Sequence, residues 1–569
     1  MAAEVSVNNG APIVKLAQNG LLSGTVKISR EGRPFYSFMG IPYATIPGRF
    51  EAAKPIQHAW RGIKSAEKAG SSCTQKAFNT LGDTLGDEIC LFINVYVSNI
   101  NTTKKSSELP TLIWIHGGGF TFGDGTSPCR PSFFMDEPVI LVTFNYRLGV
   151  FGFLSTGDDV IPGNNGLKDQ VAAFKWVQNN IPAFGGNPKK VTIFGVSAGG
   201  ASVHYHLLSS LSTGLFHGGI AQSGSALSFW AYQPNPKENA VQLATYLNCS
   251  TMEENPSKIT SLEILDCLKN LSKEELNEAQ FKYKTSWPSN LRSFNFLPVS
   301  ETKAKNSDNP FITASPMALV ARGEYASKVP LIIGTTEDEG ATMYAGVVLQ
   351  NYELVKELDS EWDLIVPKTL GYGRSFSIEK QKVISDQLRK FYFGSKAVGS
   401  ETAVNLTNMY SDVFNYPVYK SAKEYAKNGN QVFLYQYAMP GLVSIMGMPF
   451  GVTSELSKKV SHADEIQYLF DLLLPEGKSL IKSGSQEEQF SKHFVRLWTT
   501  FAKNGNPNHS WGNYLNQEWK PISQMELDGS QPIRWYKIEQ NPHTINDPYK
   551  ERMRALDKIF AEYYAQGPT

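Results

Sequence analysis

A serine between two glycines is the first group in this chain that could do covalent chemistry. Residues 195 to 199 read Gly-Val-Ser-Ala-Gly, with Ser197 at the centre of a G-x-S-x-G pattern. The run VTIFG before it is typical of a buried strand, and AGGASVHYHLLSS after it can form a helix. A strand-to-helix turn exposes the serine hydroxyl, and flanking glycines leave room for the turn. We predict that Ser197 is a nucleophile, the alternative being an incidental serine in a flexible loop.

A serine nucleophile needs donors for the negative charge that develops on the attacked oxygen. The segment LIWIHGGGF, residues 112–120, is a predicted strand that runs into three glycines. Glycines lack Cβ atoms, so their N–H groups can approach a substrate oxygen closely. We predict an oxyanion hole formed by the N–H groups of Gly118, Gly119 and Ala198. The alternative is a glycine loop that is merely flexible.

The general base should be a histidine, and the sequence has nine. Where the nucleophile sits on such a turn, the acid and then the histidine follow it in the chain. His462, in VSHADEIQYLF, lies in a predicted loop between a strand and a helix, and we predict that it is the base. The other eight precede the serine, lie in or beside predicted helices, or fall in polar loops: His58, His116, His204, His206, His217, His493, His509 and His543.

The acid should follow a strand between Ser197 and His462. The run VPLIIGTTEDEG, residues 329–340, ends a predicted strand and offers Glu337, Asp338 and Glu339. A carboxylate here can accept the imidazole N–H and fix its tautomer. The pattern does not choose among the three, and all of them could equally form a solvated turn.

Short apolar runs must form the scaffold that positions these groups. Runs at 111–115, 139–145, 191–195, 218–223, 329–334 and 431–438 are typical of strands buried on both faces. Helical spacing appears over 167–181 and over 490–501, before the stop signal NGNP. The alternation predicts an α/β fold: a mostly parallel sheet with helices on both faces, preceded by N-terminal β-hairpins. We predict a single domain over 1–569, with helix-rich cap insertions at about 230–328 and 340–430.

The composition excludes several classes of function. The 54 Lys and Arg residues nearly cancel the 53 Asp and Glu residues, which argues against a nucleic-acid partner. No apolar run reaches the roughly 18 residues of a membrane span. The start MAAEVSVNNGAPIVK lacks a basic region followed by an apolar stretch, so no signal peptide is visible.

Four of the five cysteines form two pairs of similar spacing. Cys73 and Cys90, and likewise Cys249 and Cys267, could close loops worth on the order of 3 kcal/mol each if oxidised. Free thiols of a cytosolic protein are the alternative, and Cys129 is a spare thiol. Five N-x-S/T sequons carry little weight because chance alone supplies about that number: Asn101, Asn248, Asn270, Asn405 and Asn508.

Taken together, the motifs resemble the type-B carboxylesterase/cholinesterase family. The matching segments are HGGGF, NYRLGVFGFLSTGD, VTIFGVSAGGASVH, TTEDEG and HADEIQYLF, and the similarity covers nearly the whole chain. The resemblance implies an α/β-hydrolase fold and a Ser197–Glu339–His462 triad. It also implies disulfides Cys73–Cys90 and Cys249–Cys267, a supporting role for Ser223, and Trp230 as a wall of the acyl pocket.

The sequence departs from the family pattern at three places, and the first two bear on which esters the protein accepts. The loop between Cys73 and Cys90 has no tryptophan, whereas cholinesterases place there the indole that faces choline. Insect juvenile hormone esterases carry Gln and usually Ala where this chain has Val196 and Gly200. Lys459 stands where the family usually has a glycine before the histidine. Choline esters and juvenile hormone are therefore weaker candidates than odorant, pheromone, xenobiotic or dietary esters.

The sequence thus predicts a serine carboxylesterase that needs no cofactor and no metal. Its partner is a small ester, with no nucleic acid and no membrane span, and the protein is a monomer or a homodimer. Paired cysteines favour a secreted protein, the alternative being a cytoplasmic one. The alternative functions are a juvenile hormone esterase and, from another class, a non-catalytic adhesion or binding protein or an organophosphate scavenger.

Overall fold

A computed structural model describes most of the chain. The described residues are 6–8, 10–76, 82–98, 108–126, 130–249, 259–284, 287–288, 294–302, 310–474, 477–508 and 517–566. Statements about contacts below refer to these residues.

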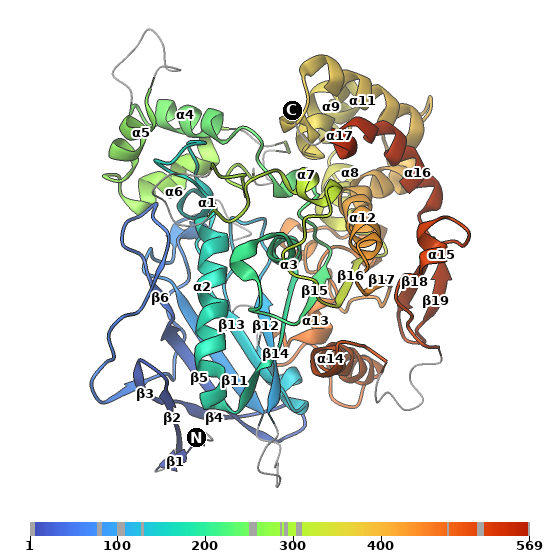
Figure 1. Cartoon of the computed structure of the whole chain (residues 1–569). Helices are drawn as coiled ribbons and strands as arrows, with labels where there is room; N and C mark the ends of the chain where they lie inside the picture. Colours follow the sequence, from blue (N-terminus) through green and yellow to red (C-terminus); the bar gives the residue numbers. More distant parts are fainter. Residues whose placement is uncertain are drawn as a thin grey trace.

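An eleven-stranded mixed sheet forms the centre of the protein (Figure 1). Its spatial order is β19-β18-β17-β16-β15-β14-β12-β13-β11-β5-β4. The strands from β13 to β18 pair in parallel, while β11, β5, β4 and β19 pair antiparallel. The bounds are β4 (Thr25–Ile28), β5 (Pro34–Pro42), β11 (Phe92–Ser98), β12 (Leu109–Ile115), β13 (Ile140–Phe144), β14 (Gly186–Val196), β15 (Gly218–Gln222), β16 (Leu331–Thr336), β17 (Val432–Tyr437), β18 (Arg534–Ile538) and β19 (His543–Asn546).

The two faces of the sheet bury separate hydrophobic cores. Along β12, Ile113 and Ile115 join one core and Leu112 and Trp114 join the other, because side chains alternate across a strand. Helix α2 (Asn165–Asn180) packs on the first core through Val171, Phe174 and Val177. Helix α14 (Gln486–Asn504) packs on the second through Phe490, Phe494, Leu497 and Phe501. The predicted α/β class and the six predicted strands are confirmed.

Helix α14 also ends where the sequence predicts. Gly505 follows it with φ of 68°, a left-handed conformation that glycine adopts without a steric penalty. The remaining core helices are α1 (Gly149–Phe153), α3 (Ala198–Leu208), α13 (Ile466–Leu469) and α15 (Gln524–Leu527).

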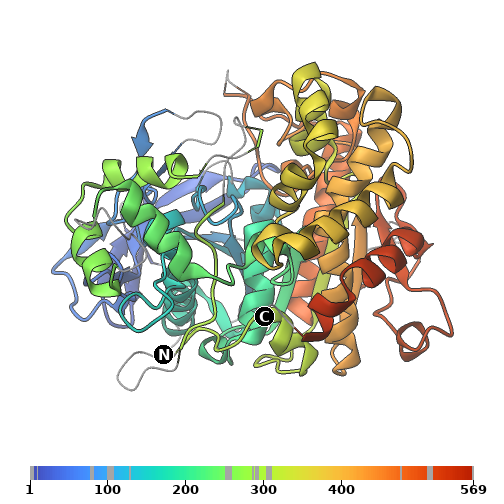
Figure 2. The ribbon, with the colours of Figure 1, turned by 90° about the horizontal axis from the view of Figure 1, so that it is seen from above.

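Two groups of helices project from the sheet on opposite sides of the molecule (Figure 2). One contains α4 (Pro236–Tyr246), α5 (Ser261–Leu268) and α6 (Lys273–Lys282), and the short helix α7 (Pro316–Ala321) follows in the chain. The other contains α8 (Val347–Leu349), α9 (Tyr352–Ser360), α10 (Trp362–Thr369), α11 (Ile378–Tyr392), α12 (Ala403–Lys427), and the C-terminal helices α16 (Lys550–Ile559) and α17 (Ala561–Gln566).

The N-terminal residues form the predicted hairpins. Strands β1 (Ser6–Asn8), β2 (Ala11–Leu16) and β3 (Gly20–Ser23) pair antiparallel in sequence, and β8 (Ile63–Ser65) joins β3 in parallel. Two-stranded pairs form between β6 (Ala44–Thr45) and β7 (Lys54–Pro55), and between β9 (Gln75–Lys76) and β10 (Thr84–Leu85).

Both predicted disulfides are present. Cys73 bonds to Cys90 and Cys249 bonds to Cys267, so each bond closes a short loop. The spare thiol Cys129 lies outside the described residues.

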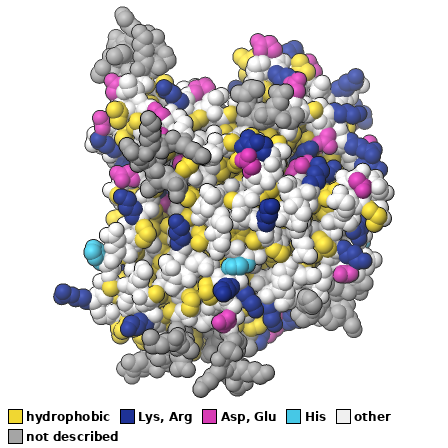
Figure 3. All heavy atoms as spheres, in the orientation of Figure 1, with side chains coloured by type: hydrophobic (Ala, Val, Ile, Leu, Met, Phe, Trp, Pro, Cys, Tyr) yellow, Lys and Arg dark blue, Asp and Glu magenta, His cyan; other side chains and the backbone are white. Residues whose placement is uncertain are grey.

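On the face shown in Figure 3, Lys and Arg side chains are interspersed with Asp and Glu. Among the described helices, none is both long enough and apolar enough to cross a bilayer.

Candidate active site

Ser197 occupies a strained turn between β14 and α3. Its φ and ψ are 60° and −121°, a conformation that non-glycine residues rarely adopt. Its N–H donates to the carbonyl oxygen of Gln222 on β15 at 2.8 Å. A Cβ on Gly195 would lie 2.7 Å from the carbonyl carbon of Gly199, so the turn has no space for larger residues at these positions. The turn therefore holds the serine at the C-terminal edge of the parallel sheet.

His462 and Glu339 form a buried pair beside this turn. The imidazole Nδ1 lies 2.6 Å from Glu339 Oε2, and both side chains are almost fully buried. The other carboxylate oxygen of Glu339, Oε1, accepts hydrogen bonds from the Ser223 hydroxyl and from the Thr336 N–H. The bond from Thr336 is 2.7 Å long. With Nδ1 bound to the carboxylate, Nε2 is the nitrogen left to take a proton.

The three acidic residues after β16 have different partners in the structure. Glu337 ion-pairs with Lys537 at 3.0 Å, and Asp338 lies 3.6 Å from the ammonium of Lys459. Only Glu339 reaches His462 among these three. The structure therefore brings together the same histidine and glutamate that the resemblance implies.

The glycine-rich loop after β12 lies against the serine turn. Gly118 and Gly119 have φ of 108° and 58°, and both line the same cavity as Ser197 and His462. His116 Nδ1 lies 2.8 Å from the Gly117 oxygen and its ring stacks on Tyr146 at 4.3 Å, which fixes the start of the loop. Ala198 is the first residue of α3, so its N–H has no intrahelical acceptor. Gly118 and Gly119 thus line one cavity with Ser197, and Ala198 follows the serine directly in the chain.

A cavity of about 100 Å³ opens over these groups. Its walls are almost entirely apolar, and none of the lining residues is an acid, a lysine or an arginine: Gly117, Gly118, Gly119, Phe122, Val196, Ser197, Trp230, Phe294, Met343, Tyr344, Phe414, Met446, His462 and Ala463. Phe414 packs on the His462 ring at 4.3 Å, and Trp230 packs on Phe414 at 5.7 Å. Such a cavity suits an uncharged, apolar substrate.

Most of these wall residues were not found from the sequence. Phe294, Met343, Tyr344, Phe414 and Met446 come from segments far apart in the chain, and no motif singles them out. Trp230 was found, through the family resemblance alone.

A second buried acid, Glu465, lies close enough to Glu339 and His462 to feel their charges. Glu465 accepts a hydrogen bond from the side chain of Gln222 at 3.0 Å, and its other oxygen has no partner. Burial, followed by the charge of Glu339, raises the pKa of Glu465 to about 7. Its neighbour Asp464 holds the histidine loop by accepting the N–H groups of Ile445 and Ser461, each at 2.8 Å. No sequence motif gave either acid a role.

Lys459 does not disturb the histidine loop. Its φ is −76° and its ψ is 154°, an extended conformation open to any residue. Its side chain is half exposed and reaches towards Asp338. The departure from the usual glycine is therefore accommodated without strain.

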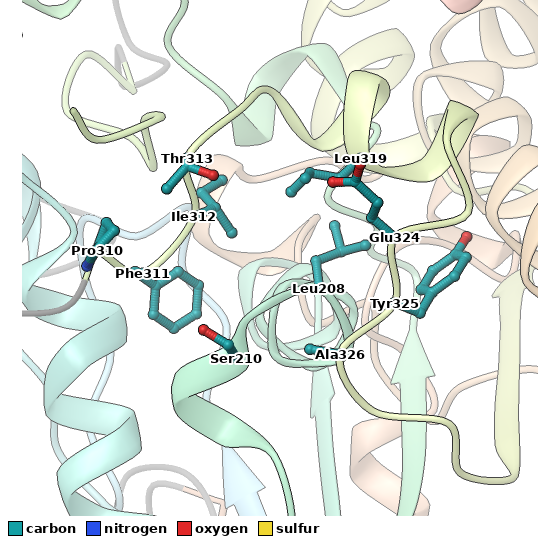
Figure 4. Close-up of a pocket in the computed structure, with 10 residues that line it drawn as sticks. All are labelled: Leu208, Ser210, Pro310, Phe311, Ile312, Thr313, Leu319, Glu324, Tyr325 and Ala326. Atoms are coloured by element: carbon teal, nitrogen blue, oxygen red, sulfur yellow. The ribbon is translucent and has the colours of Figure 1, made fainter. Parts of the chain in front are cut away.

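A larger cavity, of about 510 Å³, lies elsewhere (Figure 4). Its lining includes Leu208, which ends α3, whereas Ser197 precedes the first residue of that helix. Leu208 is the eleventh residue after Ser197, which places it roughly 16 Å from the serine along the helix axis. Of its lining residues, Glu324 is the only acid and there is no histidine, so this cavity lacks the groups for nucleophilic chemistry.

Metal chemistry has no candidate ligand set in the described part of the chain. Within those residues, His, Cys, Asp and Glu side chains do not gather in threes with the geometry to hold an ion.

The chain is similar to known proteins over most of its length. The model of the carboxylesterase family matches residues 10–556. A carboxylic ester hydrolase of Bombus ignitus is 37% identical over 88% of this chain and 86% of its own length. Esterase FE4 of Myzus persicae is 35% identical over 92% of this chain and 88% of its own length. A juvenile hormone esterase of Tribolium castaneum is 36% identical over 88% of this chain and 85% of its own length. The chain therefore belongs to the carboxylesterase family, and it is a carboxylic ester hydrolase with the α/β-hydrolase fold.

Proposed function

We propose that this protein hydrolyses neutral, apolar carboxylic esters through an acyl-enzyme on Ser197. The observation that supports this most directly is the buried pair of His462 and Glu339. His462 lines one cavity together with Ser197 and the Gly117–Gly119 loop. We assign Glu339 as the acid of the triad, and Ser223 as the residue that holds it.

In the proposed mechanism, His462 Nε2 takes the hydroxyl proton as Ser197 attacks the ester carbonyl. The bond between Glu339 and Nδ1 orients the ring and stabilises the imidazolium that forms. The N–H groups of Gly118, Gly119 and Ala198 bind the tetrahedral oxyanion. His462 then gives its proton to the leaving alcohol, and water hydrolyses the acyl-enzyme by the same steps in reverse order.

The composition of the cavity supports a substrate class. Its lining offers no carboxylate to a cationic group, so choline esters should be poor substrates, and aromatic and methionine side chains favour apolar esters. Odorant, pheromone, xenobiotic and dietary esters fit this description. Some relatives are named juvenile hormone esterase, at 36% and 32% identity, so that hormone belongs in the substrate panel.

We also propose that the protein is secreted and works as a monomer or a homodimer. Two disulfides support export, because such bonds persist in oxidising compartments. A relative is named venom carboxylesterase-6 of Apis mellifera, which agrees with this location. Asn248 and Asn270 lie exposed beside the Cys249–Cys267 bond, and we propose both as glycan sites.

The test of the nucleophile is covalent labelling. A fluorophosphonate probe should modify the wild-type protein at Ser197, mapped by mass spectrometry, and Ser197→Ala should abolish both labelling and turnover. Comparable deletions cost about 10⁶ in kcat, so a variant that retained more than about 1% of the wild-type rate would refute the assignment.

The same experiment separates the alternatives. An unlabelled wild-type protein that still binds esters would be a non-catalytic binding protein. A protein that labels and then fails to reactivate or turn over would be an organophosphate scavenger. A kcat/KM panel of short and long acyl esters, acetate odorants, juvenile hormone and choline esters would then identify the substrate class.

A further inference from the structure

The turn between α10 and α11 contains an arginine with an unusual environment. Arg374 donates from Nη2 to the backbone oxygen of Phe294 at 2.6 Å, while its Nη1 is buried without a partner. Among the described residues, no carboxylate forms an ion pair with it. A cation that is partly withdrawn from water is costly unless it is paired, and here its partner is a backbone carbonyl rather than an acid.

The residue that Arg374 holds lies directly against the glycine loop. Phe294 lines the cavity above Ser197, and a Cβ added to Gly119 would lie 2.5 Å from Phe294 Cδ1 and 2.7 Å from its Cζ. The ring therefore covers the Cα of Gly119, beside the place where the ester carbonyl must bind. Its position fixes how much space remains next to that carbonyl.

The same turn also supports a second residue of the cavity lining, Trp230. Gly371, with φ of 85°, packs against the segment that carries Trp230: a Cβ there would lie 3.2 Å from Phe229 Cβ and 3.3 Å from the Trp230 nitrogen. One short turn thus contacts the backbone of both Phe294 and Trp230.

Helix α11 holds this turn through side-chain hydrogen bonds. The Gln381 side-chain amide donates to the backbone oxygens of Gly373 and Phe376, at 2.9 and 2.7 Å. The hydroxyls of Tyr372 and Ser385 lie 2.7 Å apart. These bonds make the turn a fixed part of the helical insertion and not a free loop.

We propose that Arg374 is a positioning residue that sets the size of the acyl group this enzyme accepts, by holding Phe294 against Gly119. The insertion that carries α10 and α11 then controls selectivity without contributing a group to the reaction. This inference rests on the proposed reaction at Ser197.

The test replaces Arg374 with methionine, which has a similar reach and no donor. Phe294 then loses its support, and the space beside the ester carbonyl grows. The ratio of kcat/KM for p-nitrophenyl pivalate to that for p-nitrophenyl acetate should rise on the order of fivefold or more, since small differences in pocket contacts are worth factors of this size. Arg374→Lys keeps a donor and should give an intermediate ratio.

A matched control comes from the same insertion. Arg389 on α11 ion-pairs with Asp359 at 2.6 Å and does not line the cavity. Arg389→Met should lower the melting temperature and leave the pivalate-to-acetate ratio unchanged. A change of ratio in this variant as large as that in Arg374→Met would overturn the inference, because the effect would then reflect general loosening.

Labelling of Ser197 and a second variant separate failure of the proposed function from failure of the inference about Arg374. If the fluorophosphonate probe fails to label wild-type Ser197, the proposed function fails, whatever Arg374 does. If the wild type labels and a folded Arg374→Met keeps the wild-type ratio, only the inference fails. Should Arg374→Met not fold, Phe294→Leu provides the test: the ratio must rise in that variant too, and an unchanged ratio refutes the role of the ring.

Discussion

Replacing Glu465 with glutamine should change how the stability of this protein depends on pH. Burial and the nearby charge of Glu339 raise the pKa of Glu465 from 4.5 in an open chain to about 7 in the folded protein. Between these two values the folded state keeps a proton that the unfolded chain has released, so the free energy of unfolding falls as the pH rises. The fall should begin near pH 4.5 and level off only once the pH exceeds the folded-state pKa of about 7.

The size of the effect follows from the same shift. A difference of this size between the folded and unfolded pKa corresponds to about 3 kcal/mol of unfolding free energy. For a chain of 569 residues this is a change of melting temperature of roughly 2–3 °C. Glutamine mimics the protonated acid, because its carbonyl oxygen can still accept from Gln222. The unfolding free energy of Glu465→Gln should therefore lack this dependence on pH. The variant should gain stability relative to the wild type as the pH rises.

The measurement is the difference in melting temperature between wild type and Glu465→Gln at several pH values from about 4 to 8. Glu353 on α9 is exposed, and Glu353→Gln serves as the control that should show no such trend. A wild-type-minus-variant difference that stays constant over this range would mean that Glu465 does not change its charge on folding, and the reasoning from burial would be wrong.

Two further predictions concern the catalytic groups. Glu339→Gln should lower kcat by about 10⁴ with KM little changed, because the imidazole loses its orienting carboxylate; Glu337→Gln, at the acid that pairs with Lys537, should stay close to wild type. Gly119→Ala should lower kcat by about 10²–10³, because its Cβ meets the Phe294 ring and displaces an oxyanion donor. Gly214→Ala, with φ of 75° and open space around it, controls for backbone strain alone. Steady-state kinetics of the purified variants would check both, and equal losses in the paired variants would contradict them.

The strands were predictable because each one is a local signal. A run of five to seven apolar residues specifies a buried strand without reference to the rest of the chain, and the runs over 111–115 and 191–195 became β12 and β14. The alternation of such runs with helical periods then limits the topology to a sheet with helices on both faces. The end of α14 was also local, since the glycine of NGNP stops the helix.

The nucleophile turn was equally local, because a strand, a small-residue turn and a helix follow one another within residues 191–208. The acid was not. Glu337, Asp338 and Glu339 have the same chemistry, and the family resemblance pointed to one of them without a physical reason. The tertiary structure supplies that reason by pairing the first with Lys537 and the last with His462.

The sequence by itself determined the scaffold, the serine turn, the glycine loop and the class of reaction, because each of these depends on neighbours within about one strand or helix. The tertiary structure alone decided which carboxylate meets the imidazole, 123 residues away in the chain, and which side chains close the cavity over the serine. It also placed Glu465 close to the triad and Arg374 behind Phe294. These are contacts between segments that lie far apart in the chain. A local pattern of residue types does not predict which distant residue a buried charged group will contact.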